Sequence, residues 1–235
     1  MYSSIVPQLD FAIDQFFISY PETKSQLQYL LSNLDEQYIF SLALQGIKIG
    51  FSDEHTNLRS LIEQIYFEVQ QNGDLTLRSK NLLRDPMGLV DNPLYLFLHE
   101  SLYCESGPSS WGAESVFIDK LERPSKSRID NFFFSENIFH EYFRYEELSS
   151  FLDLMEGIMA FDQWPKQFNI EELRKSETQV TGIIYNNDAY VSREFSIESS
   201  STLNNCKAIF SDLDHHGMRN NSEEIFSLLL GEMDE

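Results

Sequence analysis

The stretch VTGIIYNND, residues 180–188, indicates the fold class of this chain. Its first six residues are rich in β-branched side chains, which favour a strand, and the polar residues that follow favour a turn. A second strand, CKAIF, is predicted at residues 206–210, with a short helix over 196–203 before it and an amphipathic helix over about 222–230 after it. Strand, helix, strand, helix is the βαβα order of an α/β protein with parallel strands.

Two parallel strands do not form a stable sheet alone, because such strands are normally buried on both faces within a larger sheet. The rest of this 235-residue chain offers no convincing further strand. We therefore predict, from the residues alone, that the sheet is incomplete.

The first two thirds of the chain have the apolar spacing of helices. One apolar stripe runs from Leu9 to Tyr20, and Pro21 is suited to the start of the next helix. Further helices are predicted over residues 39–49, 58–69, 94–103, 109–120 and 146–161, whereas the aromatic-rich stretch 131–145 has no clear pattern. The predicted class is α/β, with a mostly helical region over residues 1–165 followed by a βαβα region over residues 166–235.

The composition indicates a chain that can bury a core and that repels polyanions. The length of 235 residues is enough for one domain or two small ones, and the 42% hydrophobic and 14% aromatic residues are enough to bury a core. The 38 acidic and 17 basic residues give a formal charge of -21. This charge argues against nucleic acid or a membrane surface as a partner and would attract a protonated amine, although solubility alone also accounts for it.

The two cysteines, Cys104 and Cys206, are too few for a disulfide framework and lack zinc-ligand spacing. The N-terminal residues have neither the basic segment nor the apolar core of a signal peptide. No apolar run approaches the roughly 18 residues of a membrane span. We expect a cytoplasmic protein in which both cysteines are structural.

Asp188 and His215 are the candidate catalytic residues, because each lies a few residues after a predicted strand. The carboxyl ends of parallel strands share one edge of the sheet, where α/β proteins place their sites. A buried carboxylate beside an imidazole fixes its tautomer and stabilises its protonated form. In α/β-hydrolases the chain order is nucleophile, acid, histidine, so these residues would be the second and third members. A turn-forming aspartate and a surface histidine pair are the structural alternative.

The nucleophile of such a site is missing from the chain. No G-x-S-x-G turn occurs, and GIKIG at residues 46–50 has the glycine spacing with lysine in the centre. The triplet Asp214-His215-His216 is also similar to the metal-binding triplet of DHH phosphoesterases. The further aspartate motifs of that family are not found in the helical region.

Several motifs resemble those of the proline iminopeptidases, also called prolyl aminopeptidases, and keep that family's order. NPLYLFLHESLYC at residues 92–104 resembles N-P-L-Y-x-x-L-H-E-x-x-Y-C, and WGAE at 111–114 resembles the W-A-A-E that follows. DQWP at 162–165, YNNDAYV at 185–191 and DHHGMR at 214–219 resemble D-D-W-P, Y-Y-D-D-M-Y-V and E-H-D-G-L-R. Together these motifs cover most of the chain.

The resemblance implies an α/β-hydrolase fold with an inserted helical cap, in a serine peptidase that removes N-terminal proline from peptides. Residues 1–165 would be the cap region, and residues 166–235 the C-terminal portion of the catalytic domain. The chain would then be a C-terminal fragment without the serine nucleophile. Asp188 and His215 match the family's acid and histidine, whereas His216 replaces an acidic residue or asparagine.

The resemblance also implies substrate-binding residues. Glu100 matches the glutamate of the family's H-E, and Glu136 matches a second cap glutamate. Carboxylates at these positions would hold the substrate's protonated amine through charge-assisted hydrogen bonds. Four aromatic residues are candidates for an apolar wall around the proline ring, with the cap core as their other role: Tyr103, Phe133, Phe134 and Phe139.

This chemistry needs no metal or organic cofactor. The expected partners are a peptide with N-terminal proline and a separate N-terminal hydrolase half. Two alternatives stay open: a non-catalytic interaction protein or pseudoenzyme built from the cap, and a metal-dependent phosphoesterase that uses Asp214 and His215.

Overall fold

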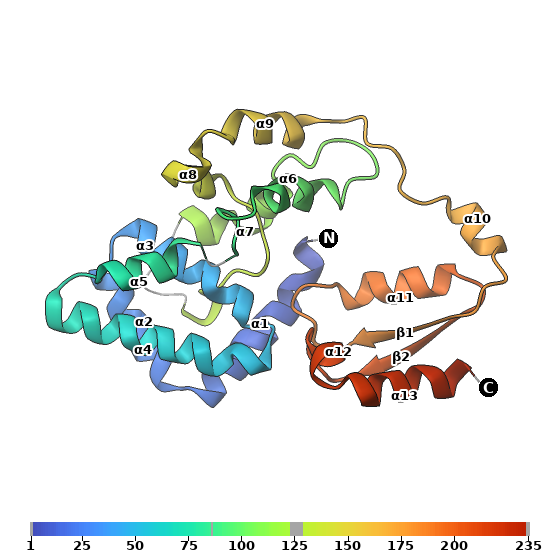
Figure 1. Ribbon diagram of the computed structural model, residues 1–235, viewed down its shortest axis with the longest axis horizontal. Coiled ribbons are helices and arrows are strands. Elements are labelled where there is room, and N and C mark those ends of the chain that lie inside the picture. Colours follow the sequence, from blue (N-terminus) through green and yellow to red (C-terminus); the bar gives the residue numbers. More distant parts are fainter. Residues whose placement is uncertain (1, 86, 123–128, 234–235) are drawn as a thin grey trace.

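The computed structural model describes residues 2–85, 87–122 and 129–233. The helical part is built from α1 (Tyr2–Ser19), α2 (Glu22–Asn33), α3 (Glu36–Leu44), α4 (His55–Asn72), α5 (Leu77–Arg84), α6 (Pro93–Ser101), α7 (Gly112–Glu122), α8 (Glu146–Ser149) and α9 (Leu152–Ala160). The 3-10 turns η1 (Gln45–Lys48), η2 (Ser52–Glu54), η3 (Ile129–Asn131) and η4 (His140–Arg144) lie between them. Figure 1 shows these helices gathered on one side, with α10 (Ile170–Lys175) on the connection to the second part.

Aromatic side chains fill much of the core of the helical part. Phe16 of α1 is fully buried, and its ring meets that of Phe133 edge-on at 6.1 Å between centroids. The main-chain N–H of Phe134 donates to the carbonyl oxygen of Ala43 at 3.0 Å, which ties the aromatic-rich stretch to the end of α3. These contacts explain why residues 131–145 have no simple periodicity, since their rings fill a core between helices rather than one face of a helix.

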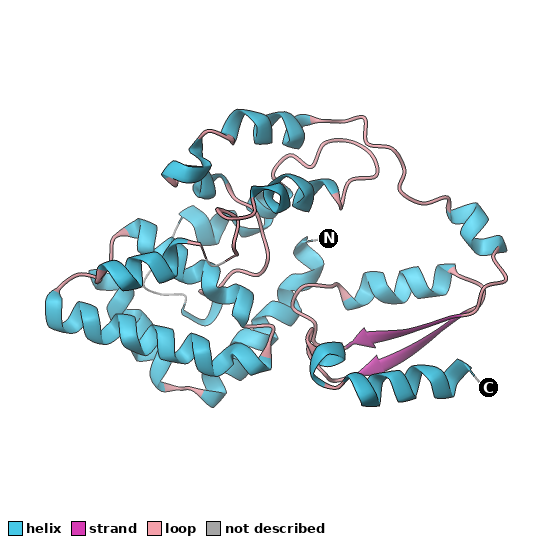
Figure 2. Ribbon diagram, in the orientation of Figure 1, coloured by secondary structure: helices cyan, strands magenta, loops and turns pink. Residues whose placement is uncertain are grey.

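The second part is a βαβα unit. The parallel strands β1 (Val180–Tyr185) and β2 (Cys206–Ser211) pair in register from their first to their last residues. α11 (Arg193–Thr202) connects them, and α12 (Gly217–Asn220) and α13 (Ser222–Met233) follow. Figures 1 and 2 show α11 and α13 on opposite faces of the strands. The prediction of a mostly helical chain with a parallel βαβα segment is confirmed, and the sheet has two strands within the described ranges.

Three helix predictions are wrong in detail. The helix predicted over residues 39–49 ends as α3 at Leu44 and is followed by the 3-10 turn η1. The helix predicted over residues 109–120 begins at Gly112, because Ser110 and Trp111 have φ angles of 49° and 55°, a left-handed conformation that does not continue a right-handed helix. The helix predicted over residues 146–161 is divided into α8 and α9. Helices α5, α10 and α12 were not predicted, because each is too short to display an apolar stripe.

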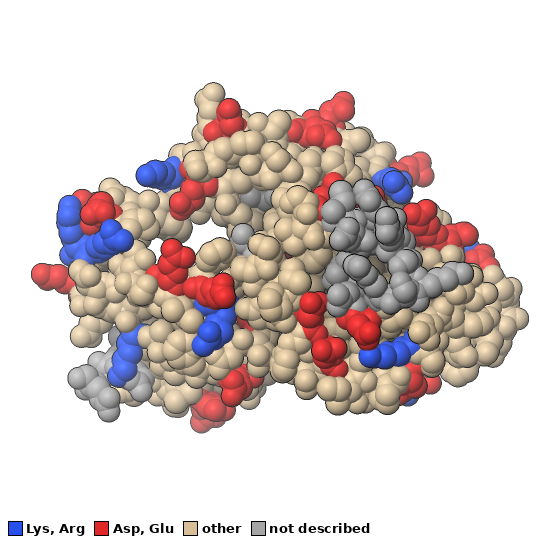
Figure 3. Space-filling view, turned by 180° about the vertical axis from the view of Figure 1, so that it is seen from behind, with Lys and Arg blue, Asp and Glu red and all other residues tan. Residues whose placement is uncertain are grey.

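The surface carries the excess of acidic residues. Figure 3 shows acidic side chains spread over one face with fewer basic ones among them, as the formal charge of -21 requires. Within the described ranges, no helix combines the length and the apolar character needed to cross a membrane.

His140 bridges two helices of the helical part. Its Nδ1 lies 2.7 Å from Glu114 Oε1 of α7, and its Nε2 lies 2.8 Å from Glu156 Oε1 of α9. The ring also stacks on Trp111 at 3.6 Å. Partial burial alone would lower the pKa of His140, but the hydrogen bonds to Glu156 and Glu114 outweigh it and raise the pKa. Acceptors at both ring nitrogens fit the doubly protonated imidazolium.

We expect His140→Gln to destabilise the protein more in acid than in alkali. The pKa of His140 is raised on folding, so its contribution is complete below the unfolded pKa of about 6.5 and is lost as the pH rises through the folded value. The side chain is 39% exposed, so the bridge contributes about 1 kcal/mol or less after solvent screening. The variant's melting temperature should fall by about 2–4 °C or less near pH 5.5, and by less near pH 9. Thermal unfolding of both proteins at the two pH values measures this, and an equal difference at both would contradict it.

Candidate active site

Asp188 lies in the turn after β1 and is oriented by its own loop. Its Oδ1 accepts the main-chain N–H groups of Tyr190 at 2.8 Å and Val191 at 3.0 Å. The side chain is only 5% exposed. The main chain therefore fixes this carboxylate and leaves Oδ2 to accept a further hydrogen bond.

His215 lies after β2 and provides that hydrogen bond. Its Nδ1 is 2.9 Å from Asp188 Oδ2. A carboxylate only accepts, so Nδ1 carries the proton, and Nε2 is the nitrogen that can take a proton from another group. The hydrogen bond to Asp188 raises the pKa of His215 against the opposing effect of burial, and the charges of Asp188, Glu136 and Asp214 add to the rise. The pair has the geometry of a histidine base with its orienting acid.

Glu136 is close to this pair although it comes from the helical part. Ser135 Oγ donates to the main-chain oxygen of Ala189 at 2.9 Å, which joins the residue before Glu136 to the residue after Asp188. Glu136 is exposed, and its negative charge is among those that raise the pKa of His215. The structure thus brings together Asp188, His215 and Glu136, which are three of the four residues that the sequence predicts for the site.

Two curated proteins match almost the whole chain, whereas no protein-family model matches it. The chain is 24% identical over 227 residues to the proline iminopeptidase of Aeromonas sobria, covering 92% of this chain and 52% of that protein. It is 20% identical over 228 residues to the proline iminopeptidase aneH of Aspergillus aculeatus, covering 90% of this chain and 50% of that protein. The chain is related to the proline iminopeptidases. It spans about half the length of these curated relatives.

Glu100, the glutamate of the proline iminopeptidase motif at residues 92–104, lies in α6, and its side chain falls outside the described part of the structure. Its neighbour His99 is buried, and burial lowers the pKa of the His99 imidazole, which favours the neutral ring. The substrate-binding role of Glu100 therefore stays a prediction.

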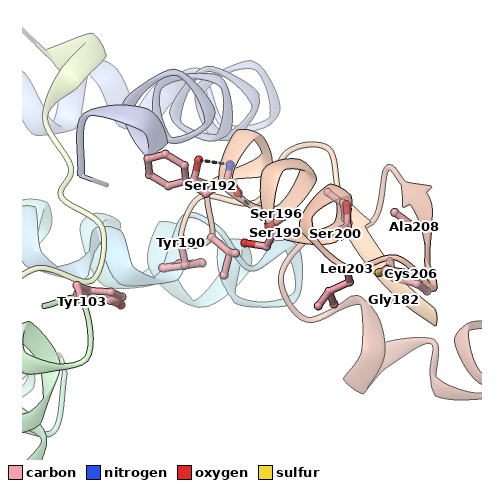
Figure 4. Close-up of a pocket in the computed structure, with 14 residues that line it drawn as sticks. Tyr103, Gly182, Tyr190, Ser192, Ser196, Ser199, Ser200, Leu203, Cys206 and Ala208 are labelled. Carbon is pink, nitrogen blue, oxygen red and sulfur yellow. Dashed lines mark hydrogen bonds between the residues drawn. The ribbon is translucent and has the colours of Figure 1, made fainter. Parts of the chain in front are cut away.

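The aromatic candidates for a wall around the proline ring divide into two groups. Phe133, Phe134 and Phe139 are buried members of the hydrophobic core, so for them the core role is confirmed. Tyr103 is 46% exposed and lines a groove of about 450 Å³ between α11 and the strands. In Figure 4, Tyr103 and Tyr190 lie toward one end of this groove and Cys206 toward the other.

The sequence did not indicate the stretch 51–53, which contacts the histidine loop. Phe51 stacks on His216 at 3.8 Å between ring centroids, and Ser52 N–H donates to Asp214 Oδ2 at 2.8 Å. These partners are more than 160 residues apart in the chain, and no local pattern signals such a contact.

The metal-dependent phosphoesterase alternative needs a metal site at Asp214 and His215, and the stretch GIKIG at residues 46–50 has only the glycine spacing of a nucleophile turn. Among the described residues, no group of three or more His, Cys, Asp or Glu side chains is arranged to hold a metal ion. Asp214 accepts hydrogen bonds from Ser52 and from the main chain of His216. Residues 46–50 lie in and after the 3-10 turn η1, which follows a helix rather than a strand.

Proposed function

We propose that this chain supplies the acid, the histidine and an amine-binding carboxylate of a serine-type prolyl aminopeptidase. The serine and the oxyanion hole would come from polypeptide outside residues 1–235. The observation that carries this proposal is the 2.9 Å hydrogen bond from His215 Nδ1 to buried Asp188, with the charge of Glu136 beside it. The names of the two relatives support the choice of substrate.

In this proposal His215 Nε2 accepts the proton of the serine hydroxyl while Oγ attacks the carbonyl carbon of the N-terminal proline. The imidazolium then gives the proton to the leaving amine as the C–N bond breaks, and water releases proline by the same proton transfers in a second round. Asp188 keeps Nδ1 protonated and stabilises the imidazolium. Glu136, with Glu100 as the second carboxylate, would hold the protonated proline nitrogen by charge-assisted hydrogen bonds. None of these steps uses a metal or an organic cofactor.

The proposal assigns residues 1–165 to a helical cap and residues 166–235 to the C-terminal portion of an α/β-hydrolase domain. The parallel pair β1 and β2 would then belong to a larger sheet, completed by a separate N-terminal hydrolase half. Apolar side chains left exposed on the second part, among them Phe195 and Phe210, support such a neighbour. The proposal keeps a cytoplasmic location, which rests on the sequence alone.

The test is complementation with a polypeptide that carries a G-x-S-x-G turn, taken from the coding sequence directly upstream of Met1. We call the chain produced together with this polypeptide the complemented protein. The proposal expects it to release naphthylamine from proline β-naphthylamide. An upstream coding sequence without such a turn in any frame, or an inactive complemented protein that has assembled, would contradict the proposal.

We expect Glu136→Gln and Glu100→Gln each to lower kcat/KM of the complemented protein for proline β-naphthylamide by about 10- to 100-fold, as for a lost hydrogen bond of about 1.5–3 kcal/mol to a charged group. An N-acetylated substrate, which has no charged amine, should be affected little. Glu177→Gln is the matched control, because Glu177 is an exposed loop residue outside the site. Equal losses on both substrates would show that the glutamates act structurally instead.

A further inference from the structure

The stretch from Ile47 to Asp53 of the helical part contacts the loops that carry both Asp188 and His215. It runs from the turn η1 into η2, just before α4. On one side it meets the histidine loop at Asp214 and His216. On the other it meets Tyr190 of the aspartate loop. One short segment, distant in sequence from both loops, therefore contacts both halves of the pair.

Phe51 is the centre of a stack of three rings. Its ring lies nearly parallel to that of His216, at 3.8 Å and 9°, and to that of Tyr190, at 4.8 Å and 18°. Two rings cannot both stack on one face, so Phe51 lies between His216 and Tyr190 and sets their separation. His215 lies at the edge of this stack, 4.9 Å from Tyr190 and 5.8 Å from Phe51 between ring centroids.

Polar contacts hold the two neighbours of His215 in the chain. Asp214 Oδ2 accepts the main-chain N–H of Ser52 at 2.8 Å and also its hydroxyl. His216 Nδ1 lies 3.1 Å from Asp53 Oδ1, and Asn220 donates to the same carboxylate at 3.2 Å. The residues on both sides of His215 are thus tied to residues 52 and 53, while His215 itself is left to bond Asp188.

Tyr190 fixes the aspartate loop to the same segment. Its hydroxyl donates to the carbonyl oxygen of Ile47 and accepts the main-chain N–H of Gly50 at 3.1 Å. Gly50 permits this approach, because a Cβ at that position would overlap the Tyr190 ring. Tyr190 also donates its own main-chain N–H to Asp188 Oδ1, so its anchoring is passed directly to the carboxylate.

We propose that Phe51, Ser52 and Asp53 are positioning residues, which hold Asp214 and His216 so that the His215 ring stays in hydrogen-bond contact with Asp188. The importance of this role for turnover rests on the proposed function. The geometric claim does not, because it concerns only where the His215 ring is held. A shift of about 1 Å in a catalytic group can cost roughly 100-fold in rate. Contacts that keep the His215 ring in place can therefore have a large effect on turnover.

The test follows the five histidine rings of the full chain by NMR with ¹⁵N-labelled histidine, with each signal assigned through single His→Gln variants. In the unmodified chain, we expect His215 to titrate above 6.5 and to carry its proton on Nδ1 when neutral. Phe51→Leu keeps apolar volume but removes the stack, and should lower the His215 pKa and mix its tautomers, because the hydrogen bond to Asp188 weakens. The carboxylates whose charges raise the His215 pKa are Asp188, Glu136 and Asp214. The Phe51→Leu substitution replaces none of these three residues.

Phe67→Leu is the matched control, since Phe67 is a half-exposed residue of α4 whose ring contacts Tyr66 rather than the site. A purely structural role for Phe51 would lower the melting temperature without moving the His215 pKa or tautomer relative to this control, and would overturn the proposal. If Phe51→Leu does not fold, Ser52→Ala provides the same readout, because exposed Ser52 loses only its hydroxyl contact to Asp214. The measurement needs no turnover. If Phe51→Leu lowers the His215 pKa while the complemented protein is inactive, the positioning role is supported and the proposed function is not.

Discussion

His215→Ala is expected to abolish turnover by the complemented protein, with kcat lower by about 10⁶-fold, as for the loss of the base in a serine protease triad. His216→Ala should cost about 100-fold or less, because it removes contacts that position His215 and not the base itself. The two rings are adjacent in the chain, but only His215 reaches Asp188, while His216 faces Asp53 and stacks on Phe51. Steady-state kinetics on proline β-naphthylamide compares the two variants directly.

Asp188→Asn belongs in the same series and should lower kcat by about 10⁴-fold, because an amide at this position favours the wrong imidazole tautomer. Asp212→Asn is a matched control, since Asp212 lies in the same loop region as His215 but accepts its hydrogen bond from Asn186. If His216→Ala abolished turnover and His215→Ala did not, the catalytic base would be His216 and not His215. Full activity in both histidine variants would contradict the proposal that the loop after β2 carries the histidine of a hydrolase site.

The chain by itself is expected to hydrolyse proline β-naphthylamide no faster than buffer, and complementation should raise the rate by about 10⁶-fold or more. The physical reason is that a histidine and an acid do not form the acyl intermediate without a nucleophile. A fluorophosphonate probe that reacts with activated serines should leave the purified chain unlabelled. In the complemented protein, it should label the upstream polypeptide.

The control for this experiment is the complemented protein with the serine of its G-x-S-x-G turn changed to alanine. It should stay unlabelled by the probe, as the chain alone does, and should keep only the residual rate that the oxyanion hole and substrate binding supply. Specific labelling of a serine within residues 1–235, abolished by His215→Ala, would contradict the proposal that the nucleophile lies outside this chain.

The residues alone were enough to predict the second part of the fold. β1 occupies the predicted residues 180–185, and β2 extends the predicted 206–210 by one residue. Both strands have a local signal in their β-branched residues and in the turn residues that end them. Their connection through one helix requires parallel strands, so the turns that carry Asp188 and His215 had to emerge at one edge of the sheet.

The helical part was predicted in outline only. Long helices such as α1 and α4 show an apolar stripe, whereas the break between α8 and α9 and the left-handed residues Ser110 and Trp111 do not follow from periodicity. The core role of Phe133, Phe134 and Phe139 also had to be read from the structure. A buried aromatic ring and a ligand-facing ring look alike in a sequence.

Sequence by itself determined which residues could act as acid and histidine, because that depended on short strands and on the order of elements along the chain. Only the tertiary structure decided which of the adjacent histidines faces Asp188, that Glu136 lies near enough to act on His215, and that Phe51, Ser52 and Asp53 hold the histidine loop. The physical reason is that these contacts join residues many positions apart. They arise when the helical part packs against the strand ends, and neither propensity nor periodicity reports on that packing.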